Sequence, residues 1–153
     1  MKIFKNKVLV LLFALLPIIG IAQRGTGGWC SNNNYSRLFN PATIVEVKGT
    51  IVSVEKIIPE KGMSNGIHLV LKTEAKENTM VHLGPEWYLN NKDIQFSAGD
   101  VIKVKGSKVT YENKAAIIAM TVWKGDSHLD LRNDKGYPKW NGWKKGQKNK
   151  RTK

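Results

Sequence analysis

The stretch Thr43–Ile58, TIVEVKGTIVSVEKII, decides the fold. Along it β-branched residues alternate with polar ones, which is the period of a strand with one buried face. The apolar phase changes around Gly49, from Val45 and Val47 to even-numbered valines beyond it. Because a strand cannot change phase by one residue without a bulge or bend, we predict one at Gly49. A strand bent in its middle can serve two faces of a small barrel.

Shorter elements follow this strand. We expect strands at 66–73, 78–83, 101–111 and 114–123, a short helix at 86–91 after Gly84-Pro85, a second bulge at Gly106, and a brief strand-like segment at 129–131. Three strands, a short helix and two strands predict an all-β fold, a five-stranded OB-like Greek-key barrel with the helix between strands 3 and 4. An SH3-like barrel and an open antiparallel sheet are the alternatives.

The ends of the chain differ in composition from its middle. Residues 1–22 have a lysine-bearing start and the apolar run Val8–Ala22, which is shorter than the roughly 20 residues that a spanning helix needs. We interpret them as a cleaved signal peptide, with an uncleaved anchor as the alternative. The mature protein is then exported, to the periplasm or the cell exterior, without a transmembrane span. It comprises a surface lead-in segment (23–42), the barrel domain (43–134) and a basic aromatic tail (135–153).

The distribution of charge and the cysteine content limit the functions that the sequence can support. The sequence has 25 Lys and Arg against 12 Asp and Glu, but eight of these bases follow Asp134, the last acidic residue. The excess of positive charge is therefore concentrated in the tail. It says little about which kind of partner the barrel binds. The single cysteine, Cys30, excludes an intrachain disulfide, a cysteine-rich zinc site and a CxxCH haem motif.

Several segments together resemble a known group of proteins. They are RLFNPATIVEVKGTIVSVEKI, GMSNGIHLVLKT, VHLGPEWYL, AGDVIKVKGSKV, KAAIIAMTVWKGD and LRNDKGYPKWNGW, within Arg37–Trp143. This pattern is similar to small exported bacterial proteins with an OB-like module, often labelled DNA-binding, and to the C-terminal domain of MamS/MamX-type magnetosome proteins. The resemblance implies the barrel and no defined activity. Because the CxxCH elements of some magnetosome proteins are absent, it implies no haem electron transfer.

The outer face of strands 2 and 3 is the first candidate site. A hairpin centred near Ala75 places His68 opposite His82, and cross-strand partners lie about 5 Å apart. Val70, Lys72 and Met80 share that face, so a ligand or partner surface is predicted there. Imidazole and thioether groups also suit a soft transition metal, which makes a copper or zinc site at His68, Met80 and His82 an alternative.

Polymer binding is the second alternative. Strands 2 and 3 contain no aromatic residue on which bases could stack, so nucleic acid is weakly supported there. In the tail, aromatic and basic residues are interleaved, as in segments that contact DNA, lipopolysaccharide or a polysaccharide. The candidate contacts are Lys139, Trp140, Trp143, Lys144 and Lys145.

The sequence offers little for catalysis. It has no nucleophile elbow, no paired acid motif and no phosphate-binding glycine loop. We therefore predict no enzyme but a non-enzymatic exported binding module, with an unknown protein or a surface polymer as its partner.

Overall fold

The computed structural model describes residues 26–30 and 32–141, so the predicted signal peptide lies outside the described residues. The elements, in chain order, are the short helical turns η1 (Ser36–Leu38) and η2 (Pro41–Thr43), and then β1 (Ile44–Ile57), β2 (Gly66–Thr73), β3 (Asn78–Pro85), α1 (Glu86–Leu89), β4 (Val101–Tyr111), β5 (Lys114–Lys124) and β6 (Ser127–Asp130). Among the helices of the described part, none is long and apolar enough to cross a membrane.

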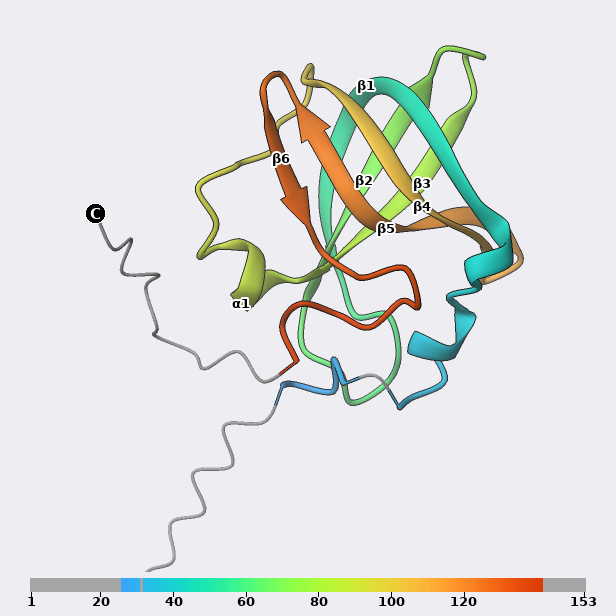
Figure 1. Ribbon diagram of the computed structural model, residues 1–153, viewed down its shortest axis with the longest axis vertical. Coiled ribbons are helices and arrows are strands. Elements are labelled where there is room, and N and C mark those ends of the chain that lie inside the picture. Colours follow the sequence, from blue (N-terminus) through green and yellow to red (C-terminus); the bar gives the residue numbers. More distant parts are fainter. Residues whose placement is uncertain (1–25, 31, 142–153) are drawn as a thin grey trace, which may run out of the picture.

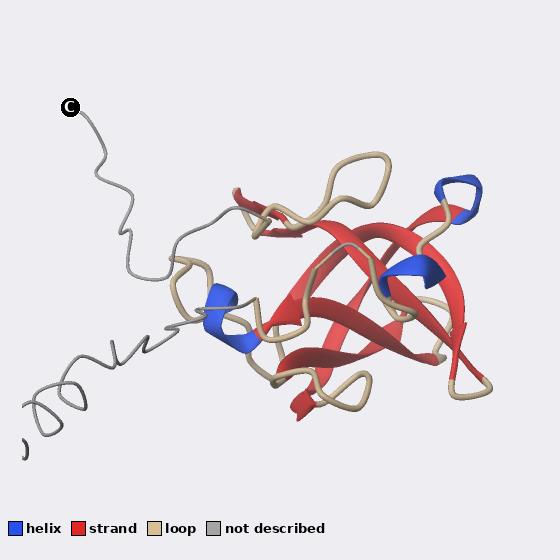
Figure 2. Ribbon diagram, turned by 90° about the horizontal axis from the view of Figure 1, so that it is seen from below, coloured by secondary structure: helices blue, strands red, loops and turns tan. Residues whose placement is uncertain are grey.

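Five strands close into a barrel. Strand β1 pairs antiparallel with β2 and β4, β2 pairs with β3, and β4 pairs with β5. A parallel pairing of β3 with β5 joins the two ends. Both ribbon views show the strands curving around a common interior (Figures 1 and 2). The all-β barrel with one short helix between the third and fourth strands is confirmed, and the open sheet is wrong because β3 and β5 meet. Strand β6 adds an edge beside β5.

Strand β1 is long and bent, so it pairs with two neighbouring strands. Residues 44–50 pair with β4, and residues 49–57 pair with β2. The bulge predicted at Gly49 is wrong in position, because the register shift lies between Ile51 and Ser53. A side chain at Gly49 would instead collide with the main-chain carbonyl of Lys72. The second predicted bulge is confirmed, since the β4–β5 register shifts at Gly106.

The barrel interior is a continuous apolar core. It is filled by inward-facing residues of every barrel strand, with Tyr88 and Leu89 of α1 added. The strand residues with at most 3% exposure in this cluster are Ile51, Leu69, Leu71, Val81, Leu83, Ile102, Val104, Ile117, Ala119 and Val122. A close-packed interior of this kind fixes the strands and thereby the side chains on their outer faces.

Candidate functional site

The outer face of β2 and β3 has the register expected from the sequence. His68 lies opposite His82, and Val70 lies opposite Met80. The five predicted residues of this face differ in exposure, however. The two histidines are fully buried, Val70 and Met80 are partly buried, and Lys72 is exposed. The face therefore has a covered half at the histidines and an open half at Val70 and Met80.

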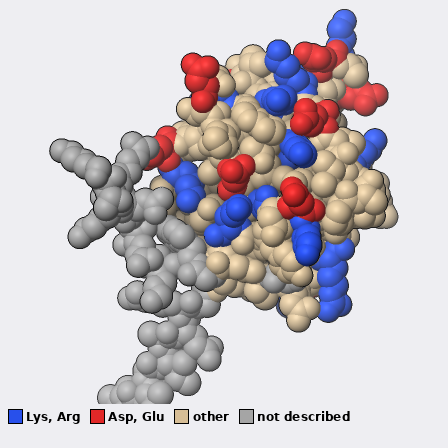
Figure 3. All heavy atoms as spheres, viewed as in Figure 1, with Lys and Arg blue, Asp and Glu red and all other residues tan. Residues whose placement is uncertain are grey.

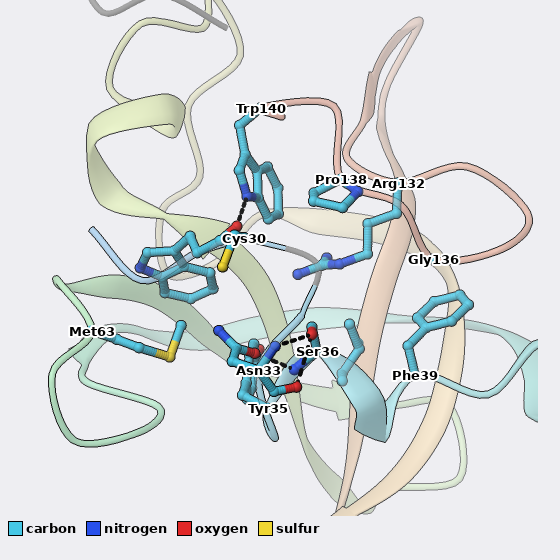
Figure 4. A pocket seen from close by; sticks show the side chains of 12 residues that line it. Cys30, Asn33, Tyr35, Ser36, Phe39, Met63, Arg132, Gly136, Pro138 and Trp140 are labelled. Carbon is cyan, nitrogen blue, oxygen red and sulfur yellow. Dashed lines mark hydrogen bonds between the residues drawn. The ribbon is translucent and has the colours of Figure 1, made fainter. Parts of the chain in front are cut away.

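Two segments from opposite ends of the described chain cover the histidine half. Trp29 packs against Gly66, and Trp140 packs against Gly84, at positions where a Cβ atom would collide with the indole rings. The two indole rings meet edge to face, and Trp140 Nε1 donates a hydrogen bond of 2.7 Å to the carbonyl of Trp29 (Figure 4). We call residues 26–30 with 32–43, and residues 131–141, the flanking segments. They meet beneath the barrel in Figure 1.

Beneath the flanking segments the two histidines form a stacked pair. Their ring centroids are 3.6 Å apart and their planes differ by 22°. The Tyr35 hydroxyl lies 2.9 Å from His82 Nδ1, and the Tyr111 ring stands edge-on to His82. Both ring nitrogens of His68 and Nε2 of His82 are buried and have no hydrogen-bond partner among the described residues. Unpaired buried polar atoms cost stability, so this pair is an unusual feature of the fold.

The environment keeps both imidazoles neutral. Burial lowers the pKa of His68 well below its ordinary value, and the neighbouring His82 and Arg132 lower it further. Burial and Arg132 act in the same direction on the pKa of His82, which falls to about 3. Burial also raises the pKa of Tyr35, so this group remains a neutral phenol. The covered half thus carries no charge from these three groups at neutral pH.

The predicted copper or zinc site does not fit this arrangement. A chelated ion lies about 2.0–2.1 Å from each imidazole nitrogen and in the plane of each ring. Two nearly parallel rings 3.6 Å apart direct their lone pairs side by side rather than to one point. Met80, the third predicted ligand, lies on the open half, where it lines a pocket that His68 and His82 do not line. In the described chain, no three His, Cys, Asp or Glu residues gather where an ion could be held.

The open half is a pocket of about 440 Å³ between the β2–β3 and β4–β5 hairpins. Val70, Met80, Tyr111, Ala115 and Ala116 supply apolar wall, and the polar side chains of Asn78, Thr79, Glu112 and Lys114 complete the lining. Pockets for small molecules have this size and this mixture of a mostly apolar wall with a few polar groups. Within the described part of the chain, the structure therefore divides the predicted face into a covered half at the histidines and a half that borders an open pocket.

Tyr111 joins the two halves. Its ring contacts His82 and also lines the open pocket, while its hydroxyl donates a hydrogen bond of 2.9 Å to the carbonyl of Pro59. The sequence patterns did not single out Tyr111, Tyr35 or Arg132 as residues of this site. The position of Tyr111 at the end of an alternating strand was a usable signal. Tyr35 and Arg132 lie in segments without periodicity, where the sequence gives no comparable signal.

A second hollow of about 470 Å³ adjoins this pocket at the same end of the barrel. It shares Thr79, Ala115 and Ala116 with the first and is bordered by β1 and the β2–β3 turn. The parallel pairing of β3 with β5 spans only three residue pairs, so the barrel wall is short here. Both hollows follow from that short seam.

The tail residues predicted to contact a polymer are only partly described, and one of them is buried. Trp140 is 1% exposed, so it is unavailable for stacking on a polymer, whereas Lys139 is exposed. Trp143, Lys144 and Lys145 lie outside the described residues. On the face seen in Figure 3, acidic and basic side chains are interspersed rather than gathered by sign. This mixture agrees with the composition of the described residues up to Asp134, which carry 13 Lys and Arg against 12 Asp and Glu.

The barrel of this chain matches the model of one known protein family. The model of the MamS/MamX magnetosome protein family matches residues 43–129, from the start of the barrel into β6. No curated protein matches the chain. Among solved structures, the S. pombe Stn1–Ten1 complex contains a chain of 16% identity that superimposes with a TM-score of 0.40, over 59% of each of the two chains.

Proposed function

Because the chain belongs to the MamS/MamX magnetosome protein family, we propose that its barrel is a non-enzymatic binding module whose ligand occupies the open half of the β2–β3 face. The observation that carries this proposal is the pocket of about 440 Å³ at Val70, Met80 and Tyr111. It lies on the face where the sequence predicted a ligand surface, and OB-type barrels commonly use that face for recognition.

The lining of the pocket indicates the class of ligand. Its apolar wall favours a flat or branched apolar body, because burial of such a body releases ordered water. Glu112 and Lys114 lie together beside the β4–β5 turn, and Asn78 lies at the start of β3. They offer both signs of charge and one amide to a polar group of the ligand. A small amphipathic molecule, or one side chain of a partner protein, fits this description.

The positions of the histidines and of the charged groups of the open pocket support a binding role without catalysis. The histidines, which would be the natural general bases, are neutral and sealed beneath the flanking segments. The described lining of the open pocket contains one carboxylate and one ammonium group but neither a histidine nor a cysteine. We also infer export, supported by the signal pattern of residues 1–22.

A fluorescent probe tests the proposal. The apolar anionic dye 1-anilinonaphthalene-8-sulfonate should bind the folded protein, and Met80→Glu, which places a negative side chain in the pocket and repels the sulfonate, should weaken binding at least about tenfold. Val52→Glu is the matched control, because Val52 is 49% exposed on β1 and does not line the pocket. Equal dye affinity in both folded variants would contradict the proposal.

A further inference from the structure

Arg132 is a buried cation of the flanking segments that the proposed function does not use. It follows β6 and is 6% exposed. Its Nη1 atom donates hydrogen bonds to the carbonyls of Leu83 on β3, at 2.9 Å, and of Ala119 on β5, at 2.6 Å. The guanidinium also lies 4.8 Å from the centre of the Trp140 ring. These contacts hold the group firmly above the seam of the barrel.

This charge has no counter-ion among the described residues. The ion pairs there join Lys56 to Glu86, Lys124 to Asp100 and His128 to Asp130. Tyr35, the one neighbour whose negative form would offset the charge, is held neutral by its burial. Although burial lowers the pKa of Arg132 to about 10, the group is still positive at neutral pH. A buried charge that lacks an opposite charge is costly to desolvate.

A small cavity lies directly in front of this group. Its volume is about 20 Å³, enough for one water molecule or one ion of similar size. The guanidinium of Arg132 reaches toward it between Trp140 and Ser36 (Figure 4). Both flanking segments contribute to the wall, with Cys30, Asn33 and Ser36 from one and Pro138 and Trp140 from the other. The hydrogen bonds that Arg132 donates to described residues both use Nη1, and the guanidinium end of the side chain faces this cavity (Figure 4).

We propose that this cavity binds one small monovalent anion, of the size of chloride, on Arg132. The anion neutralises the buried guanidinium and joins the two flanking segments, because both line its site. A cavity of about 20 Å³, with room for about one water-sized particle, suits a monatomic anion. The apolar walls favour a weakly hydrated ion, since such an ion gives up its water most easily.

Bromide locates the site directly. Crystals of the protein soaked in sodium bromide should show an anomalous scattering peak within about 3.5 Å of Nη2 or Nε of Arg132. Bromide binds where chloride does, and its anomalous signal distinguishes it from water. A cavity that holds only water in these crystals would overturn the proposal.

A solution measurement gives the affinity. Raising sodium chloride against sodium gluconate at constant ionic strength should increase the melting temperature by about 3 °C once the site is saturated. Arg132→Met should lose this increase, whereas Arg37→Met, which removes an exposed arginine that does not line the cavity, should keep it. If Arg132→Met does not fold, the presence or absence of the bromide peak decides whether the cavity binds an anion. An equal chloride response in all three proteins would contradict the proposal, and it would leave dye binding at Met80 unaffected.

Discussion

At the scale of single residues, the stacked pair of His68 and His82 is the most unusual feature. The hairpin register that brings them together could be predicted from the position of the turn at Ala75, and it is observed. Their burial could not be predicted. The groups that cover them, among them Trp29 and Tyr35, belong to a glycine- and asparagine-rich segment in which no period shows which residues face inward.

The buried pair makes stability depend on pH. In the unfolded chain each histidine takes up a proton near pH 6.5, whereas in the folded protein His82 does so only near pH 3 and His68 at still lower pH. The unfolded state therefore binds more protons in this window. The free energy of unfolding should fall by about 1.4 kcal/mol per pH unit for each histidine as the pH drops below 6. Urea unfolding at several pH values measures this slope.

Substitution separates the contribution of the pair from other acid effects. His68→Leu should roughly halve the slope, because one of the two buried groups no longer titrates. It also removes two unpaired buried nitrogens, so it should cost little stability at neutral pH. His128→Gln is the control, since His128 is solvated in both states, its side chain being 59% exposed in the fold. A slope unchanged by His68→Leu would show that the pair is not the source.

At the scale of elements, the barrel strands were predictable and the flanking segments were not. Alternating apolar residues fixed the strands to within two residues at either end, as in β2 at 66–73 and β4 at 101–111. The bulge in β1 was misplaced because Gly49 serves a close approach to Lys72 rather than a change of register. A glycine at a phase change can mark either a close approach of a neighbouring main chain or a bulge. The sequence alone does not distinguish the two.

The flanking segments depend on two glycines that leave room for indole rings. Gly84→Ala would place a Cβ atom 2.7 Å from the Trp140 ring, so it should displace this ring and cost about 1–3 kcal/mol of stability. In a Trp140→Leu background the same change should cost much less, because the colliding ring is gone. Chemical unfolding of the four proteins in this cycle measures the coupling. Additive effects of the two substitutions would contradict the packing described here.

At the scale of the whole molecule, the barrel has one face whose two halves differ in how far they are covered. The flanking segments close the histidine half, and the short seam between β3 and β5 leaves the other half open. The sequence predicted the barrel and the face, since both follow from strand order and turn position. It could not predict the division of the face, because that division arises from contacts between residues such as Trp29 and Trp140, 111 positions apart.

Methyl NMR during a titration with 1-anilinonaphthalene-8-sulfonate tests most directly whether the open half is the binding surface. The resonances of the Met80 ε-methyl and the Val70 methyls should move, while those of Met63 and Met120, both buried outside the pocket, should stay in place. If the shifts instead centred on exposed valines such as Val52 and Val101, with Met80 unmoved, the ligand surface would lie elsewhere on the barrel.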